Sequence, residues 1–270
     1  MFVTTPPGDE WHWIRDIHNS YHKWTQQSLA SWLTKATKDN SKPPKAKHVR
    51  RILIASLRDP CVTPLFVAQY FLDERPWRDD ARISAKCLYI MLVLLQYREE
   101  LASQFEVSRF TDKVVAYWDG KFPEEKQQIS TAISLRIGSI IHSKLIFHQN
   151  HPEVEGNFAI KGERNFDKII PDLRKHLKTV EYETMGVEAA VSSSESFTAT
   201  VLWQPMVDET VSAYRLLKSI DKSSESNIIL GDCEKLIQKL PDYPFIATTV
   251  IFPLPGENIT IPRERFPKNI

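Results

Sequence analysis

Apolar residues recur at steps of three and four along most of the chain, which is the spacing of one face of an α-helix. The first such pattern predicts a long helix over residues 10–37. Pro43 and Pro44 cannot lie inside a helix, so the chain must turn before a second helix opens at Lys45 and continues through VRRILIASL. The residues between these two helices are therefore expected to form a short, stiff loop.

The same periodicity continues along the rest of the chain, interrupted by Pro, Asp and Gly. The stretch SSSES at 192–196 is expected to be a surface loop, and FIATTVIF at 245–252 is expected to be extended before a Pro-rich tail. Further helices are predicted at about 62–73, 80–97, 98–105, 108–119, 124–149, 163–191, 201–221 and 225–240.

Few glycines and no alternation of strands with helices predict an all-α fold. We expect a helical solenoid or superhelix of about eight to ten helices, in which each helix packs on its sequence neighbours. Residues 1–255 are expected to form one domain, with 1–25 extending the first helix, and 256–270 form an irregular, Pro-rich C-terminal tail.

The composition limits the classes of ligand. The chain is 42% apolar, enough for a sizeable core, and its formal net charge is only +1. A chain-wide basic field of the kind that binds nucleic acid is therefore missing, so anion binding must come from a local patch.

Length and flanking charges also limit membrane insertion. The apolar stretch CLYIMLVLLQY at 87–97 is bounded by Lys86 and Arg98 and is too short to span a bilayer, so it predicts a buried helix. The N-terminus lacks the features of a signal peptide, which favours a cytoplasmic location. The widely spaced Cys61, Cys87 and Cys233 are expected to be reduced, buried thiols.

The loop region KATKDNSKPPKAKH, at 35–48, carries the candidate chemistry. Lys45, Lys47 and His48 lie within four residues, and Lys35 lies ten positions before Lys45. Free amides and the positive dipole end at a helix start favour an anion, lysines add charge, and a histidine can donate a hydrogen bond to phosphate. Arg50 and Arg51 would extend the patch. This pattern suits a phosphorylated ring; a solvated, lysine-rich loop is the alternative.

Lys35-Ala36-Thr37 followed by Lys45-x-Lys47-His48 resembles the phosphoinositide-binding motif of ANTH domains, the membrane-binding modules of clathrin adaptors. The resemblance implies an ANTH-like domain that holds phosphatidylinositol 4,5-bisphosphate on an exposed surface without a deep pocket. The residues that inherit this role are Lys35, Lys45, Lys47 and His48, with Lys38 and Arg50 beside them.

Two further stretches resemble the actin-linking branch of that family, which is related to huntingtin-interacting proteins. These are KLIFHQNHPEVEGNF at 144–158, where His151 replaces the usual asparagine, and DCEKLIQKLPDYP at 232–244. The resemblance implies cooperation with the ENTH domain of an epsin-like adaptor. It also implies contact with clathrin coat components through regions outside this chain, and a peripheral position on the plasma membrane and in coated pits.

Other chemistry is weakly represented. His18 and His22 are four residues apart without an evident third metal ligand, and His148, His151 and Glu153 favour a structural role, so we expect no metal and no cofactor. The catalytic fingerprints GxSxG, HExxH and the P-loop are absent, so an enzyme is not expected. A helical scaffold that binds cargo or a SNARE, with an incidental basic patch, is the main alternative; nucleic-acid binding ranks last.

Overall fold

The computed structural model of the chain describes residues 27–98, 101, 107–121, 123–160, 166–194 and 196–240. The predicted helix over 10–37 is therefore described only from residue 27, and it is helical through residue 36. Most of the predicted helix at 98–105, the extended segment at 245–252 and the C-terminal tail lie outside the described residues. The proposed domain limits stay predictions for the same reason.

The described residues fold almost entirely into α-helices, and their isolated β-bridge joins Val154 to Ile160. The prediction of an all-α fold with about eight to ten helices is confirmed. After the helical residues 27–36, the described helices are α2 (Ala46–Arg58), α3 (Pro64–Glu74), α4 (Ala81–Gln96), α5 (Ser108–Trp118), α6 (Glu125–Asn150), α7 (Phe166–Ser194), α8 (Phe197–Ile220) and α9 (Ser224–Lys239).

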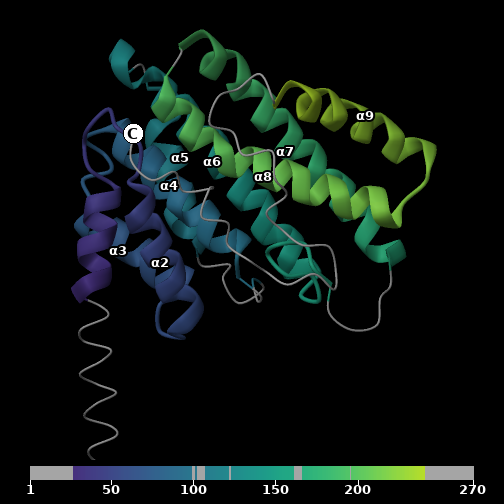
Figure 1. Ribbon diagram of the computed structural model, residues 1–270, viewed down its shortest axis with the longest axis horizontal. Coiled ribbons are helices and arrows are strands. Elements are labelled where there is room, and N and C mark those ends of the chain that lie inside the picture. Colours follow the sequence, from purple (N-terminus) through teal and green to yellow (C-terminus); the bar gives the residue numbers. More distant parts are fainter. Residues whose placement is uncertain are drawn as a thin grey trace, which may run out of the picture.

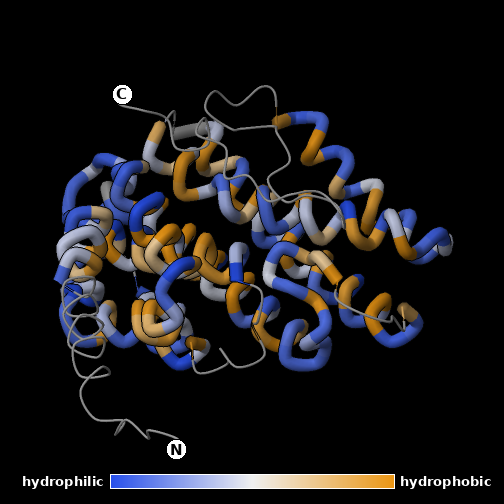
Figure 2. Tube along the Cα trace, turned by 60° about the horizontal axis from the view of Figure 1, so that its bottom comes forward, coloured by the Kyte–Doolittle hydropathy of each residue, from blue (hydrophilic) through white to orange (hydrophobic). Residues whose placement is uncertain are grey.

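The helices form a superhelix that extends from α2 and α3 at one end to α9 at the other (Figure 1). Apolar positions lie mainly on the inner sides of the helices (Figure 2). Each of α6, α7, α8 and α9 packs on its neighbours in sequence, as predicted. Helix α4 differs, because it also contacts helices distant in sequence: its partners are α2, α3, α5, α6 and α8. Every residue of α4 except Arg82 is buried, so this helix is the centre of the fold.

Side chains at the helix starts explain several boundaries. Thr63 accepts a hydrogen bond from the amide of Phe66 at 3.1 Å, and Asp80 accepts one from the amide of Arg82 at 2.8 Å. The prediction of a surface loop at 192–196 is wrong. Helix α7 continues to Ser194, and Ser196 caps α8 by accepting a hydrogen bond from the amide of Ala199 at 3.3 Å. The serine-rich stretch therefore ends one helix and begins the next.

Two apolar cores stabilise the arrangement. The larger surrounds α4 and the smaller lies where α6, α7, α8 and α9 meet the segment 151–160. Representative members of the larger core are Leu33, Ile52, Phe71, Leu92 and Trp203, and of the smaller core Phe147, Phe158, Leu173, Leu217 and Cys233.

All three cysteines are free thiols. Cys87 and Cys233 are buried, as expected, whereas the expectation for Cys61 is wrong. Cys61 is exposed because it lies in the turn between α2 and α3. In the part of the chain that the structure describes, no helix has the length and hydropathy to cross a bilayer.

Candidate functional site

The candidate anion site is built around the start of α2. Lys45 is the N-cap residue, but no side chain accepts from the first amides of the helix, and no acidic residue lies in its first turn. The amides of His48 and Val49 already bond to the carbonyl of Lys45, at 2.8 and 3.2 Å. The earlier amides of the turn, with the positive end of the helix dipole, remain available to a negatively charged group.

His48 lies at the centre of this site and is only 6% exposed. Its Nδ1 is buried and has no hydrogen-bond partner. Burial, followed by the charges of Lys47, Lys35, Arg51 and Lys45, lowers the pKa of the imidazole. Lys35 belongs to the preceding helix and Lys45, Lys47 and Arg51 to the start of α2, so charges from both sides of the loop act on the ring.

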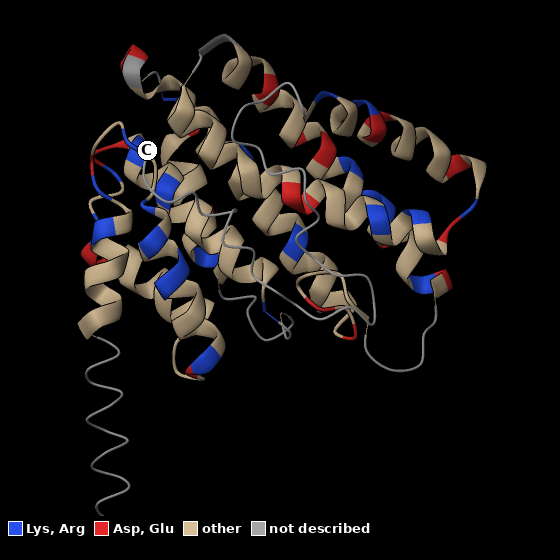
Figure 3. Cartoon of the chain, viewed as in Figure 1, with Lys and Arg blue, Asp and Glu red and all other residues tan. Residues whose placement is uncertain are grey.

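The lysines of the site are available to a ligand. Lys35, Lys38, Lys45 and Lys47 have exposed side chains, and within the described residues none of them forms an ion pair. Figure 3 shows Lys and Arg residues distributed along α2 and around the loop before it. An unneutralised group of cations at a helix start raises the local concentration of anions.

The two arginines differ from the lysines. Arg50 is half-buried, and its buried Nε has no hydrogen-bond partner. Arg51 is exposed and its guanidinium lies 5.7 Å from the centre of the Trp32 ring, which fixes its direction. Sequence reasoning named both arginines, and the charge of Arg51 is among the causes that lower the pKa of His48.

The loop that joins residues 27–36 to α2 is held by side chains from distant helices. Arg75, at the end of α3, donates to the Oγ1 of Thr37 at 2.9 Å and to its carbonyl at 2.8 Å. Thr198, in the first turn of α8, donates to the carbonyl of Ser41 at 2.5 Å. Sequence reasoning missed these contacts because they join residues 38 and 157 positions apart.

The stretch 144–158 contributes several buried polar side chains to the interior of the fold. Lys144 is fully buried and pairs with Glu209 at 2.7 Å, and His148 bonds to the carbonyl of Val154 at 2.9 Å. His151 lies 2.9 Å from the carboxylate of Asp172. No cluster of three or more His, Cys, Asp or Glu residues in the described part is arranged to hold a metal ion. His18 and His22 lie outside that part.

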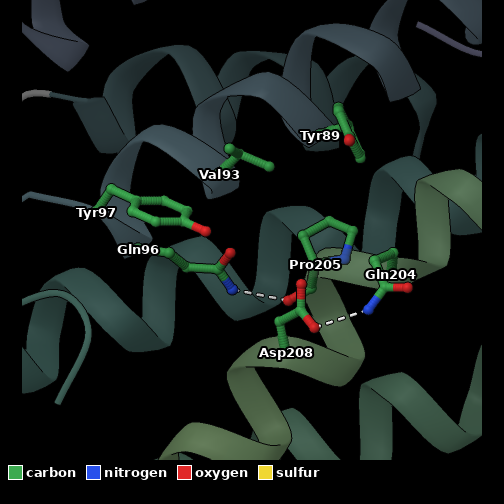
Figure 4. A pocket seen from close by; sticks show the side chains of 7 residues that line it. All are labelled: Tyr89, Val93, Gln96, Tyr97, Gln204, Pro205 and Asp208. Atoms are coloured by element: carbon green, nitrogen blue, oxygen red, sulfur yellow. Dashed lines mark hydrogen bonds between the residues drawn. The ribbon is translucent and has the colours of Figure 1, made fainter. Parts of the chain in front are cut away.

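A small hollow between α4 and α8 is a poor candidate for a ligand site (Figure 4). Its volume is about 20 Å³, enough for one water molecule. Gln96 donates to the carbonyl of Pro205 at 2.7 Å, and Gln204 donates to Asp208 at 2.7 Å, so polar groups of the hollow bond to each other. The candidate anion site is instead an open surface.

Comparisons with known proteins give one informative match. No family model matches the chain, and neither does any curated protein. Among solved structures, the ENTH domain from epsin-2 in complex with phosphatidylinositol 4,5-bisphosphate is similar, with a TM-score of 0.56 and 18% sequence identity. The match covers 82% of this chain and 86% of that chain.

The chain has an ENTH-like fold. At this level of identity, the similarity applies to the helical superhelix and not to the residues of the anion site. The ENTH-like arrangement agrees with the predicted fold class, while the ANTH type and its actin-linking branch stay predictions.

Proposed function

We propose that this protein is a phosphoinositide-binding membrane-recruitment module of an endocytic adaptor, of the ANTH type. The proposal is supported by an uncapped helix start where the buried Nδ1 of His48 has no partner and the charges of Lys35, Lys45 and Lys47 act on the same ring. The similarity in fold to a domain solved with phosphatidylinositol 4,5-bisphosphate supports it.

Each residue has a role that follows from its position. One phosphate of the headgroup would meet the first amides of α2 and the His48 ring, and Lys45 and Lys47 would flank it. Lys35 would reach a second phosphate from the preceding helix, with Lys38 and Arg50 at the edge of the site. A headgroup held this way lies on the surface, as it must when the rest of the lipid stays in the bilayer.

The energetics require more than one attachment. If each base near an anionic membrane contributes about 1 kcal/mol, five bases give about 5 kcal/mol, which corresponds to a sub-millimolar dissociation constant. Stable recruitment therefore needs several copies or a second lipid-binding partner acting by avidity. An ENTH-type, epsin-like adaptor on the same membrane, with clathrin coat components bound through regions outside this chain, would meet this requirement at coated pits.

Vesicle co-sedimentation tests the proposal. Wild-type protein should pellet with vesicles that contain phosphatidylinositol 4,5-bisphosphate more strongly than with phosphatidylserine vesicles of equal charge. The double variant Lys45→Glu, Lys47→Glu should bind at least about tenfold more weakly, since each reversal removes an attraction of about 1 kcal/mol and adds a repulsion.

The matched control reverses two exposed lysines of α7, Lys175→Glu and Lys178→Glu, which changes the net charge equally at a distance from the site. This control should bind like wild type. Equal pelleting of wild type and of the Lys45, Lys47 variant would defeat the proposal and favour the protein-interaction scaffold, whose peptide binding would be independent of lipid.

A further inference from the structure

A buried lysine lies directly beneath the basic loop. Lys86 belongs to α4 and is 1% exposed, in a helix whose neighbouring positions are apolar. Its Nζ donates to the carbonyl of Lys38 at 2.6 Å, the carbonyl of Asn40 at 2.8 Å and the Oδ1 of Asn40 at 3.1 Å. An ammonium group has three donors, so loop atoms satisfy all of them.

A cation at this depth is costly unless it is fully hydrogen-bonded. Burial, followed by the charge of Arg82, lowers the pKa of Lys86 to about 8, although the charges of Asp80 and Asp39 act in the opposite direction. The ammonium form therefore predominates at neutral pH. Because its hydrogen-bond partners are loop atoms, the charge is well accommodated in only one conformation of the loop.

The backbone carbonyls of the loop accept hydrogen bonds from side chains of the helices around it. Between residues 37 and 41, four carbonyls accept from side chains that lie outside the loop: Arg75 on Thr37, Lys86 on Lys38 and Asn40, and Thr198 on Ser41. The donors draw the backbone oxygens toward the helices, and the lysine side chains at 38 and 42 are exposed. This loop also determines how far Lys35 lies from Lys45.

We infer that Lys86 is a positioning residue for the anion site, because it anchors the loop whose conformation sets the spacing between Lys35 and the start of α2. The inference rests on the proposed function. A loop that is already ordered loses less conformational entropy when it binds, so anchoring increases affinity without a direct contact to the ligand.

The variant Lys86→Met tests this role, because methionine keeps most of the side-chain volume and removes the three donors. Two measurements are made: binding to vesicles with phosphatidylinositol 4,5-bisphosphate, and hydrogen exchange of the loop amides in the free protein. We expect about tenfold weaker binding and faster exchange confined to residues 38–42.

The matched control is Cys87→Ala, which alters the adjacent, fully buried residue of α4 without touching the loop. It should lower the melting temperature yet leave loop exchange and vesicle binding unchanged. If Lys86→Met and Cys87→Ala both lose vesicle binding in proportion to their loss of melting temperature, the inference is overturned.

If Lys86→Met does not fold, Asn40→Ala provides the test from the loop side. It removes one of the three acceptors of Lys86 and should weaken binding by about two- to threefold. If wild type binds the vesicles and the folded variant binds equally well, the inference about Lys86 is overturned and the proposed function is not. Failure of wild type to bind would overturn the proposed function, and loop exchange would still decide whether Lys86 orders the loop.

Discussion

Lys144 Nζ lies 2.7 Å from Glu209 Oε1, and both side chains are completely buried. The same ammonium donates to the carbonyl of Gly156 at 2.7 Å. Glu209 also accepts from Gln96 Nε2 at 3.1 Å and lies 3.1 Å from His176 Nε2. One network thus joins α4, α6, α7, α8 and the segment 151–160 inside the molecule.

Breaking this ion pair should strongly destabilise the fold. Lys144→Met leaves the carboxylate of Glu209 buried without its cation, and we expect a loss of about 3–5 kcal/mol in the free energy of unfolding. Urea denaturation measures it. The matched control is Lys218→Met, which breaks an exposed pair with Glu234 and should cost less than about 1 kcal/mol. Similar losses for the two variants would contradict this interpretation.

Acid should destabilise the protein through the same network. Burial lowers the pKa of His148 and of His176, so below pH 6.5 the unfolded chain binds protons that the folded state resists. Burial would raise the pKa of Glu209, but Lys144 and His176 overcome this effect and lower it to about 2. Its contribution to stability is therefore lost as pH falls from 4.5 toward 2.

Both effects have the same sign, so the urea midpoint should fall steadily from pH 7 to pH 4 at constant ionic strength. A midpoint that stays constant or rises over this range would contradict the assigned protonation states.

Gly156 should not tolerate a side chain. A Cβ there would overlap the carbonyl oxygen of Leu95 and lie 2.7 Å from that of Arg98, to which the Gly156 amide also bonds at 2.8 Å. Gly156→Ala should cost about 1–3 kcal/mol or more. Gly231→Ala on α9 is the control, because nothing lies within 4 Å of its Cβ, and it should be neutral or stabilising by up to about 1 kcal/mol.

Lipid binding should strengthen as pH falls from 7.5 to 6. Burial and the neighbouring cations keep His48 neutral in the free protein, and a bound phosphate would raise its pKa, so binding takes up a proton. The variant His48→Gln should lose this dependence and retain only the opposing effect of lipid phosphate protonation. Identical pH profiles for wild type and variant, measured by co-sedimentation, would exclude His48 from the site.

Helix positions were largely predictable because apolar spacing and proline positions are local signals. The prolines at 43 and 44 located the turn before α2 to within one residue. The start of α8 was predicted at residue 201 and lies at Phe197, because the serine-rich stretch before it was interpreted as a loop. Ser196 was a better signal, since serine is a favoured N-cap residue.

The candidate site was predictable only where its residues are close in sequence. Lys45, Lys47 and His48 share one helix turn, so their proximity follows from local geometry. Lys86 was interpreted as the polar flank of an apolar stretch, although it is one of the most buried side chains. Its partners are 46 and 48 residues away, and hydrophobic periodicity carries no information about such contacts.

The burial of nearly every residue of α4 also limits how this architecture can be shortened. In a linear repeat protein, end units can be removed because each unit contacts only its neighbours. Here α8 follows α4 by a hundred residues yet covers part of it. A fragment that stops before α8 would leave an apolar flank of α4 facing water, so the central helix is fully enclosed only once α8 has been added.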